Sequence, residues 1–142
     1  MKKVIIIDAS LAAKWLLPDE EDFTAETIKK SFANREIAIA VPFFIFYEVN
    51  NILRSAVLSK RITLKDSLNL YKGFLSLNFN VYSSEELFQN ILQIALELKI
   101  SSYDAVYVAL AQSLQIPLYT ADAKLVRKAN HKLVKSLEDY VL

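Results

Sequence analysis

The sequence contains no cysteine, one histidine and one glycine among its 142 residues. Without cysteine the chain cannot form a disulfide, a Cys-ligated zinc site, an iron–sulfur cluster or a cysteine nucleophile. Because His131 stands alone, a catalytic metal held by the usual set of three protein ligands rich in histidine is excluded as well. The lone Gly73 cannot supply the glycine-rich loops that bind dinucleotides or nucleotide phosphates. These absences remove much of cofactor chemistry from consideration.

Neither sign of charge dominates the chain, since 17 Lys and Arg face 16 Asp and Glu. Any affinity for nucleic acid must therefore come from local patches. Hydrophobic residues make up 54% of the chain, and its length fits one globular domain spanning residues 1–142. No apolar stretch approaches the roughly 20 residues of a membrane-spanning helix. We expect a cytoplasmic protein that does not associate with a membrane.

Short β-branched runs alternate with helical patterns along the chain. Pro42 is placed in the first turn of the third helix, and capping residues Thr63, Ser83 and Ser101 precede the next three helices. This alternation predicts an α/β sandwich around a mostly parallel sheet. The expected strands are residues 4–7, 37–41, 79–82, 117–120 and 132–134. The expected helices are residues 9–17, 23–32, 42–59, 63–77, 83–98, 103–114 and 123–129.

Charge is scarce in three apolar stretches, residues 4–13, 37–53 and 100–123. Burying a carboxylate is costly unless something compensates, and these stretches contain no Lys or Arg. Carboxylates that meet repel one another, which either raises their pKa values or recruits a divalent cation. An oxygen-preferring ion such as Mg²⁺ or Mn²⁺ fits acids that have no cysteine or clustered histidine beside them. The only charged residues in these stretches are four acids: Asp8, Glu48, Asp104 and Asp122.

The positions of these acids suggest that they meet. Asp8 and Asp122 follow predicted strands, and the carboxyl edge of a parallel sheet is where α/β proteins bind ligands. Glu48 lies on an inward-facing stripe in the middle of a predicted helix, and Asp104 opens an apolar helix. Three of the acids also have a purely structural interpretation. Asp8 and Asp122 can cap the helices that follow them, and Asp104 can complete a capping box with Ser101.

Four sequence blocks carry the acids: Ile7 to Ser10, Pro42 with Glu48 to Leu53, Tyr103 to Ala111, and Tyr119 to Asp122. In this order and spacing they resemble the PIN domain, the small nuclease fold of the toxins in VapBC toxin–antitoxin pairs. The resemblance covers nearly the whole chain. It implies a three-layer α/β fold whose five-stranded parallel sheet is flanked by helices.

The resemblance also implies a function. Asp8, Glu48, Asp104 and Asp122 would bind Mg²⁺ or Mn²⁺ and cut RNA by hydrolysis, while a cognate antitoxin would neutralise the toxin. Ser10 and Thr120 match positions whose hydroxyls support the site, and Asn51 matches a polar position one helical turn from Glu48. Such toxins usually form homodimers, and the helices within residues 52–75 are apolar enough for that interface. The chain departs from its relatives at Gln115, where they usually have a glycine after the helix that carries Asp104.

Basic residues offer a surface for RNA phosphates. Lys124, Arg127 and Lys128, followed by Lys132 and Lys135, lie just beyond Asp122 with no acid among them. Lys14 lies near Asp8, and Arg54 lies on the Glu48 helix. A solvated helix face is the alternative interpretation of this run. Binding that weakens steeply with salt is expected if these cations contact phosphates.

Two other functions fit parts of the sequence. The acids could form a pocket that binds RNA or protein without cutting it. Asp8 could instead be the nucleophile of a phosphoryl-transfer protein, like haloacid-dehalogenase-like phosphatases or response-regulator receivers. The former need a second Asp two residues on, where this chain has Ser10. His131 is expected to be exposed and uninvolved, and we expect Trp15, Tyr47, Tyr71 and Phe74 in the core or an interface.

Overall fold

The computed structural model describes residues 1–83 and 85–141 and contains one five-stranded sheet in which neighbouring strands are parallel. The strand order is β3-β2-β1-β4-β5. This arrangement confirms the predicted α/β fold with a parallel central sheet. The strands are β1 (Lys3–Ile7), β2 (Ile37–Pro42), β3 (Asn80–Tyr82), β4 (Leu118–Thr120) and β5 (Val134–Ser136). The last strand lies two residues later than predicted at its start.

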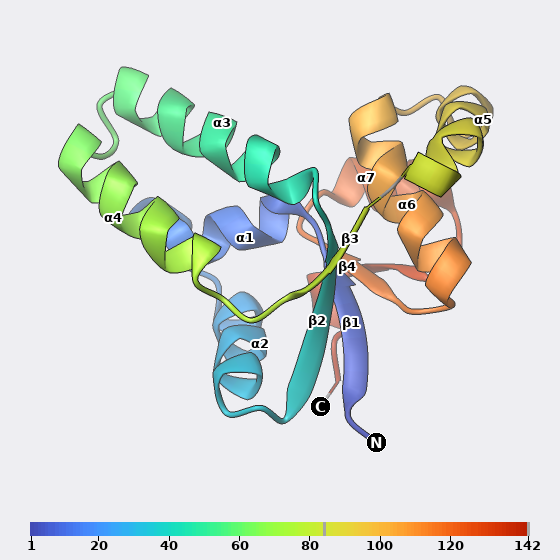
Figure 1. The fold of residues 1–142 in the computed structure, drawn as a ribbon, viewed down its shortest axis with the longest axis horizontal. Helices are drawn as coiled ribbons and strands as arrows, with labels where there is room; N and C mark the ends of the chain where they lie inside the picture. The colour runs from blue at the N-terminus through green and yellow to red at the C-terminus, as the bar shows by residue number, and fades with distance from the viewer. Residues whose placement is uncertain (84, 142) are drawn as a thin grey trace.

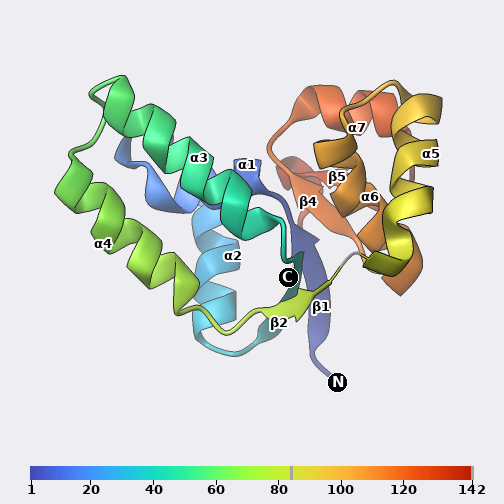
Figure 2. The same cartoon turned by 45° about the horizontal axis from the view of Figure 1, so that its top comes forward.

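Helices cover the sheet on two sides, as Figures 1 and 2 show. Helices α1 to α4 lie on one side, with α3 and α4 packed as an antiparallel pair, and α5 to α7 lie on the other. The helices are α1 (Ala9–Leu16), α2 (Phe23–Ala33), α3 (Ile45–Leu58), α4 (Leu64–Leu75), α5 (Phe88–Leu98), α6 (Ser102–Leu114) and α7 (Ala123–Ala129). Within the described ranges, none of the helices has the length and apolar character needed to cross a membrane.

The central strands are buried on both faces because helices cover both sides of the sheet. Ile5, Ile6 and Ile7 of β1 have no exposed surface. The expected core residues Trp15 and Phe74 are buried as well. Tyr71 is half-buried, and Tyr47 is exposed. The prediction of a central strand from the continuous β-branched run is therefore confirmed.

Side chains cap several helices at their amino ends. Thr63 and Ser101 accept hydrogen bonds from the backbone N–H groups of Asp66 and Asp104, as predicted. The predicted cap at Ser83 is wrong, because α5 begins only at Phe88 and no side chain caps it. A 3₁₀ turn at Glu85–Leu87 precedes the helix, and the buried Leu87 anchors this turn in the core.

The predicted helix start at Pro42 is also wrong. Pro42 is the last residue of β2, and α3 begins at Ile45. The next residue, Phe43, donates its N–H to the carbonyl of Tyr82 in β3 at 2.8 Å, so pairing with β3 continues beyond Pro42. A proline, which has no N–H to donate, is tolerated at such a strand end. Glu48 consequently lies in the first turn of α3 and not in the middle of a helix.

Gln115 forms the turn for which relatives usually have glycine. Its φ of 55° is in the left-handed region, and its N–H donates to the carbonyl of Ala111 at the end of α6. Its side-chain Nε2 donates to the carbonyl of Gln112 at 2.7 Å. Lys99 and Asn130 end α5 and α7 in the same conformation. The chain thus ends three helices without glycine, at a cost of roughly 1 kcal/mol for each left-handed residue.

Candidate functional site

The strand order creates a switch point between β1 and β4, because the connection after β1 leads to β2 on one side and the connection after β4 leads to β5 on the other. Ile7 of β1 pairs with Tyr119 of β4. Continuing this register by one residue sets Asp8 opposite Thr120. The hydroxyl of Thr120 donates to Oδ2 of Asp8 at 2.5 Å. The topology therefore brings together two residues that lie 112 positions apart.

Asp8 is held by hydroxyl and backbone donors. Its Oδ1 accepts from the Ser10 hydroxyl at 2.7 Å and from the N–H of Leu11 at 3.1 Å, which caps α1. The oxygens of Ser10 and Thr120 in turn accept the N–H groups of Ala121 and Asp122. Each hydroxyl has one hydrogen, and both hydrogens are directed at Asp8. Ser10 and Thr120 thus contact Asp8 directly through their hydroxyl groups.

Burial dominates the electrostatics of Asp8, whose side chain is only 5% exposed. Burial raises the pKa of Asp8, and the hydrogen bonds from Thr120, Ser10 and Leu11 oppose that rise without cancelling it. The negative charge of Asp104 raises the pKa of Asp8 further. Asp8 is therefore a carboxylate held in place at an electrostatic cost.

Glu48 reaches the same region from the first turn of α3. The hydroxyl of Tyr107 donates to its Oε1 at 2.5 Å. Burial raises the pKa of Glu48 to about 7, and the charges of Asp8 and Asp104 act in the same direction, against the hydrogen bond from Tyr107. Stacking of Phe44 on Tyr103, with ring centroids 5.3 Å apart, joins the starts of α3 and α6 beside this contact.

Asp104 and Asp122 complete the group. Asp104 lies in the first turn of α6, where burial raises its pKa and the charge of Asp122 raises it further. Asp122 caps α7, with its Oδ1 accepting the N–H groups of Lys124 and Leu125. The capping interpretations of Asp8 and Asp122 are therefore correct. Both capping hydrogen bonds of Asp122 use Oδ1, so its Oδ2 accepts no hydrogen bond from the described residues.

All four acids lie at helix amino ends, because Asp8 and Asp122 cap α1 and α7 while Glu48 and Asp104 lie in the first turns of α3 and α6. Each helix dipole partly compensates a negative charge there. The charges influence one another in a chain from Asp8 through Glu48 and Asp104 to Asp122.

The spacing of the acids is wider than that of a closed metal site. Across residues 1–83 and 85–141, no three acidic or histidine side chains lie close enough to hold one ion. The described structure therefore shows four acids in electrostatic contact, and their joint coordination of an ion remains a prediction. The donor set fits a hard cation, because it consists of carboxylates and hydroxyls, the ligand type that Mg²⁺ and Mn²⁺ prefer.

The remaining predicted site residues differ in their exposure and in their relation to the acids. Asn51 is exposed on α3, and among the described residues no hydrogen bond links it to the acids. Lys14 is half-buried on α1, whereas Arg54, Lys124 and Arg127 are exposed. Lys128 is exposed on α7 and donates to the carbonyl of Lys99 at 2.9 Å, and its positive charge lowers the pKa of Asp104.

His131 was predicted to be exposed, but it is half-buried, and its Nδ1 accepts the N–H of Leu133 in the turn before β5.

The contact of Tyr107 with Glu48 was not predicted from the sequence. A tyrosine inside an apolar helix was the available signal, since a buried hydroxyl usually has a hydrogen-bond partner.

Comparisons with known proteins agree with this architecture. The model of the PIN domain family matches residues 5–131. VapC ribonuclease Mb0985 of Mycobacterium bovis and Ribonuclease VapC9 of Mycobacterium tuberculosis are each 32% identical over 125 residues, covering 86% of this chain and 88% of each relative. The crystal structure of PAE2754 from Pyrobaculum aerophilum aligns with a TM-score of 0.72 at 26% identity, covering 96% of this chain and 85% of that chain.

More distant structures share the fold alone. A toxin–antitoxin complex from Klebsiella pneumoniae aligns with a TM-score of 0.59 at 14% identity, covering 86% of this chain and 89% of that chain. FitAB bound to a DNA fragment aligns with a TM-score of 0.62 at 14% identity, covering 97% of this chain and 98% of that chain.

Proposed function

The chain belongs to the PIN domain family, and from this membership and the four coupled acids we propose that it is a divalent-metal-dependent ribonuclease. The observation that carries the proposal is the gathering of these acids at four helix amino ends beside the β1–β4 switch point. Relatives that are 32% identical over most of the chain are named ribonucleases, which supports RNA as the substrate.

The acids Asp8, Glu48, Asp104 and Asp122 would hold Mg²⁺ or Mn²⁺. When bound, such an ion lowers the pKa of a water molecule and stabilises negative charge on the leaving oxygen. Ser10 and Thr120 keep Asp8 in place through their hydroxyls. A carboxylate oxygen of the group that does not contact the ion would accept a proton from the attacking water. The oxygen of this water would bond to phosphorus as the bond to the leaving oxygen breaks.

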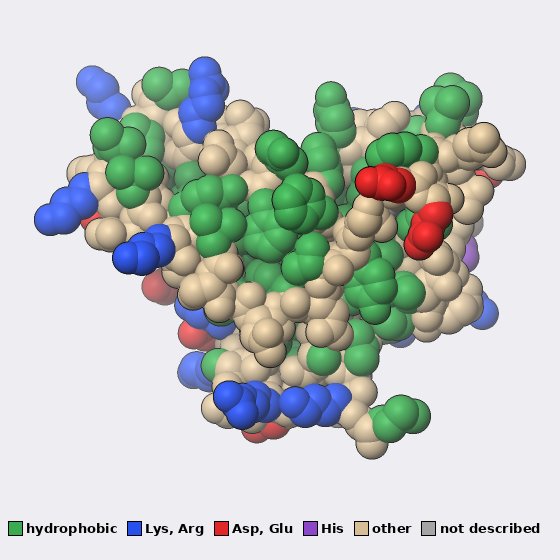
Figure 3. All heavy atoms as spheres, viewed as in Figure 1, with side chains coloured by type: hydrophobic (Ala, Val, Ile, Leu, Met, Phe, Trp, Pro, Cys, Tyr) green, Lys and Arg blue, Asp and Glu red, His purple; other side chains and the backbone are tan. Residues whose placement is uncertain are grey.

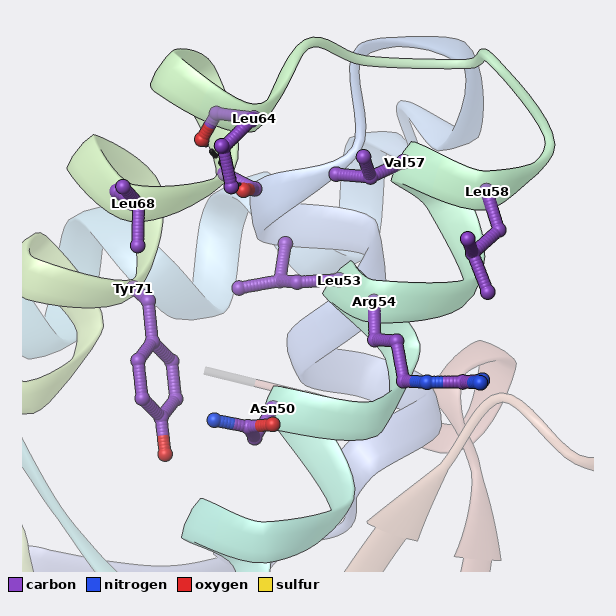
Figure 4. A pocket seen from close by; sticks show the side chains of 9 residues that line it. Asn50, Leu53, Arg54, Val57, Leu58, Leu64, Leu68 and Tyr71 are labelled. Atoms are coloured by element: carbon purple, nitrogen blue, oxygen red, sulfur yellow. Dashed lines mark hydrogen bonds between the residues drawn. The ribbon is translucent and has the colours of Figure 1, made fainter.

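Basic residues on α7 would hold the RNA backbone. Asp122 caps this helix, so the exposed Lys124 and Arg127 follow it within two turns. Arg54 extends away from the apolar side chains of α4 in Figure 4 and is therefore available to a phosphate. Lys14 on α1 and Lys128 on α7 would add further positive charge.

We further propose that the protein is the toxin of a type II toxin–antitoxin pair, neutralised by a cognate antitoxin. Solved proteins of the same fold include a toxin–antitoxin complex and FitAB on DNA. An apolar groove of about 260 Å³ lies between α3 and α4, and Figure 4 shows Leu53, Leu64 and Leu68 pointing into it. Co-expression with the product of the neighbouring gene should yield a stable complex with suppressed ribonuclease activity.

A homodimer is the second assembly that we propose. Figure 3 shows hydrophobic side chains gathered over α3, α4 and β3. Exposed hydrophobic residues on these elements include Tyr47 of α3, Leu75 of α4 and Val81 of β3. Exposed hydrophobic side chains gathered in one place often mark a protein–protein interface. Light scattering on the purified protein should give twice the chain mass of 16.2 kDa.

The ribonuclease proposal is tested by RNA cleavage with Mg²⁺ or Mn²⁺. Asp8→Asn and Asp104→Asn should each lower the cleavage rate by at least about 10²-fold, because each removes a carboxylate that would hold the ion, and the ion would stabilise the negative charge of the transition state. Asp66→Asn, an exposed acid on α4, is the matched control and should cleave like wild type. Equal cleavage by all variants would indicate a contaminating nuclease. An Mn²⁺-binding wild type that cleaves no RNA would favour the non-catalytic binding module.

A further inference from the structure

Tyr107 occupies an unusual position for a tyrosine. It lies one helical turn beyond Asp104 on α6, and its side chain is 1% exposed. Its neighbours on the helix, Ala105, Val108 and Ala111, are buried. The ring is therefore fixed by packing, while its hydroxyl points across to α3 and donates to Oε1 of Glu48, 59 positions earlier in the chain.

Glu48 depends on this contact more than Asp8 and Asp122 depend on any one of theirs. Asp8 accepts hydrogen bonds from two hydroxyls and a backbone N–H, and Asp122 accepts from two backbone N–H groups. Glu48 has one more rotatable bond than Asp, and among the described residues Tyr107 is its only hydrogen-bond donor. Without the Tyr107 hydroxyl, only packing would restrict the Glu48 carboxylate.

The hydroxyl of Tyr107 acts as a donor. A tyrosine phenol carries its proton at neutral pH and a carboxylate oxygen can only accept, so the hydrogen bond runs from Tyr107 to Glu48. A protonated phenol beside a carboxylate donates to one oxygen and leaves the other available. Here the occupied oxygen is Oε1, and Oε2 accepts no hydrogen bond from the described part of the chain.

We propose that Tyr107 is a positioning residue that orients Glu48 for divalent-metal binding, with Oε1 held by the phenol and Oε2 presented to the ion. This inference rests on the proposed metal-dependent function. Tyr107 contacts neither the ion nor the RNA in this account and acts only through Glu48. A hydrogen-bond donor that orients a metal ligand is worth roughly 10- to 100-fold in metal affinity.

The test is the Mn²⁺ affinity of Tyr107→Phe, measured by titration with electron paramagnetic resonance of the free ion. The substitution removes one oxygen and preserves the ring, so the core packing is retained. We expect Mn²⁺ binding about 10-fold weaker than in wild type. Tyr71→Phe is the matched control, because the Tyr71 hydroxyl also donates within the protein, to the carbonyl of Phe46 at 2.6 Å. Its Mn²⁺ affinity should be that of wild type.

A double-mutant cycle separates positioning from a general structural effect. In the Glu48→Gln background, Tyr107→Phe should change Mn²⁺ affinity by less than about 2-fold, because the ligand that Tyr107 orients is already impaired. Saturating Mn²⁺ should also restore RNA cleavage by Tyr107→Phe toward the wild-type rate.

Two results would overturn the inference alone. One is wild-type Mn²⁺ affinity in Tyr107→Phe, and the other is an undiminished effect of Tyr107→Phe in the Glu48→Gln background. A wild-type protein that binds no Mn²⁺ would overturn the proposed metal-dependent function together with this inference. The two failures are therefore distinguishable by the wild-type titration.

Discussion

Acids in two regions of this protein have pKa values that are shifted in opposite directions. Asp19 and Glu20 lie in the 3₁₀ turn Pro18–Glu20, where Arg61 donates to Asp19 at 2.7 and 2.9 Å and to Glu20 at 2.7 Å. These contacts hold the pKa of Asp19 below its usual value. At the sheet edge, by contrast, the pKa values of Asp8, Glu48 and Asp104 are all raised.

The difference lies in where the compensating charge comes from. Arg61 makes the only ion pairs found in the parts of the chain that the structure describes. Asp19 and Glu20 at the surface thus have a protein cation as their partner, although leaving surface acids unpaired costs little free energy. The acids at the sheet edge, Asp8 buried and the others partly buried, cost more free energy to leave unpaired, yet they have only helix dipoles, hydrogen bonds and the more distant Lys128. This allocation is expected if the sheet edge receives its cation from solution.

The largest expected effect is stabilisation by Mn²⁺. An ion that binds the folded state alone adds about 2.7 kcal/mol to the free energy of unfolding at 100 times its Kd. Wild type should therefore melt at a higher temperature with Mn²⁺ than with EDTA, and Asp104→Asn should lose most of this gain. Asp19→Asn should keep it. Equal gains in the two variants, measured by thermal unfolding, would mean that the ion binds elsewhere.

A smaller effect is expected when charge is removed without metal. At pH 8 in EDTA, Glu48→Gln should raise the free energy of unfolding, because the amide can still accept from Tyr107 but carries no charge. The raised pKa of Glu48 sets an upper limit of about 3 kcal/mol, and we expect about 1 kcal/mol because the side chain is only partly buried. Glu20→Gln, which removes a partner of Arg61, should give no such gain in denaturant unfolding.

The smallest effect is the pH dependence of stability in EDTA. Glu48 has its pKa raised from 4.5 to about 7 on folding, so between these values the folded state binds more protons than the unfolded state. Its contribution to stability is complete below about pH 4.5 and is lost as pH rises through 7. The melting temperature of wild type should accordingly fall more between pH 5 and pH 8 than that of Glu48→Gln.

Asp19 supplies the contrast for that measurement. Its pKa is lowered on folding, so its contribution is present above its unfolded value of 3.8 and is lost as pH falls through the folded value. Asp19→Asn should therefore leave the decline between pH 5 and pH 8 unchanged. Parallel declines in wild type and Glu48→Gln would show that Glu48 is not the group that titrates.

The sequence predicted the sheet because a buried strand is a local pattern, and the run ending at Ile7 marked a central strand. The scarcity of charge singled out Asp8 and Asp104 as candidate site residues, and their role as metal ligands stays a prediction. The position of Glu48 within its helix was predicted incorrectly. The reason is tertiary, because pairing of Phe43 with Tyr82 of β3 extends the strand connection and delays the helix.

Contacts between distant residues could not be predicted in the same way. The hydroxyl of Tyr107 and the carboxylate of Glu48 meet only because α3 and α6 start beside each other, and no spacing in the sequence encodes that distance. Arg61 and Asp19 likewise meet through the turn between α3 and α4. Gln115 was recognised as a departure from the family pattern, but its left-handed turn is visible only in the backbone.

We propose that a cation from solution brings the four acids together. A crystal structure of the protein grown with Mn²⁺ would locate the ion by its anomalous scattering. One strong manganese peak is expected at the carboxyl edge of β1 and β4, coordinated by oxygens of at least three of Asp8, Glu48, Asp104 and Asp122. A peak elsewhere, or no peak at millimolar Mn²⁺, would contradict it.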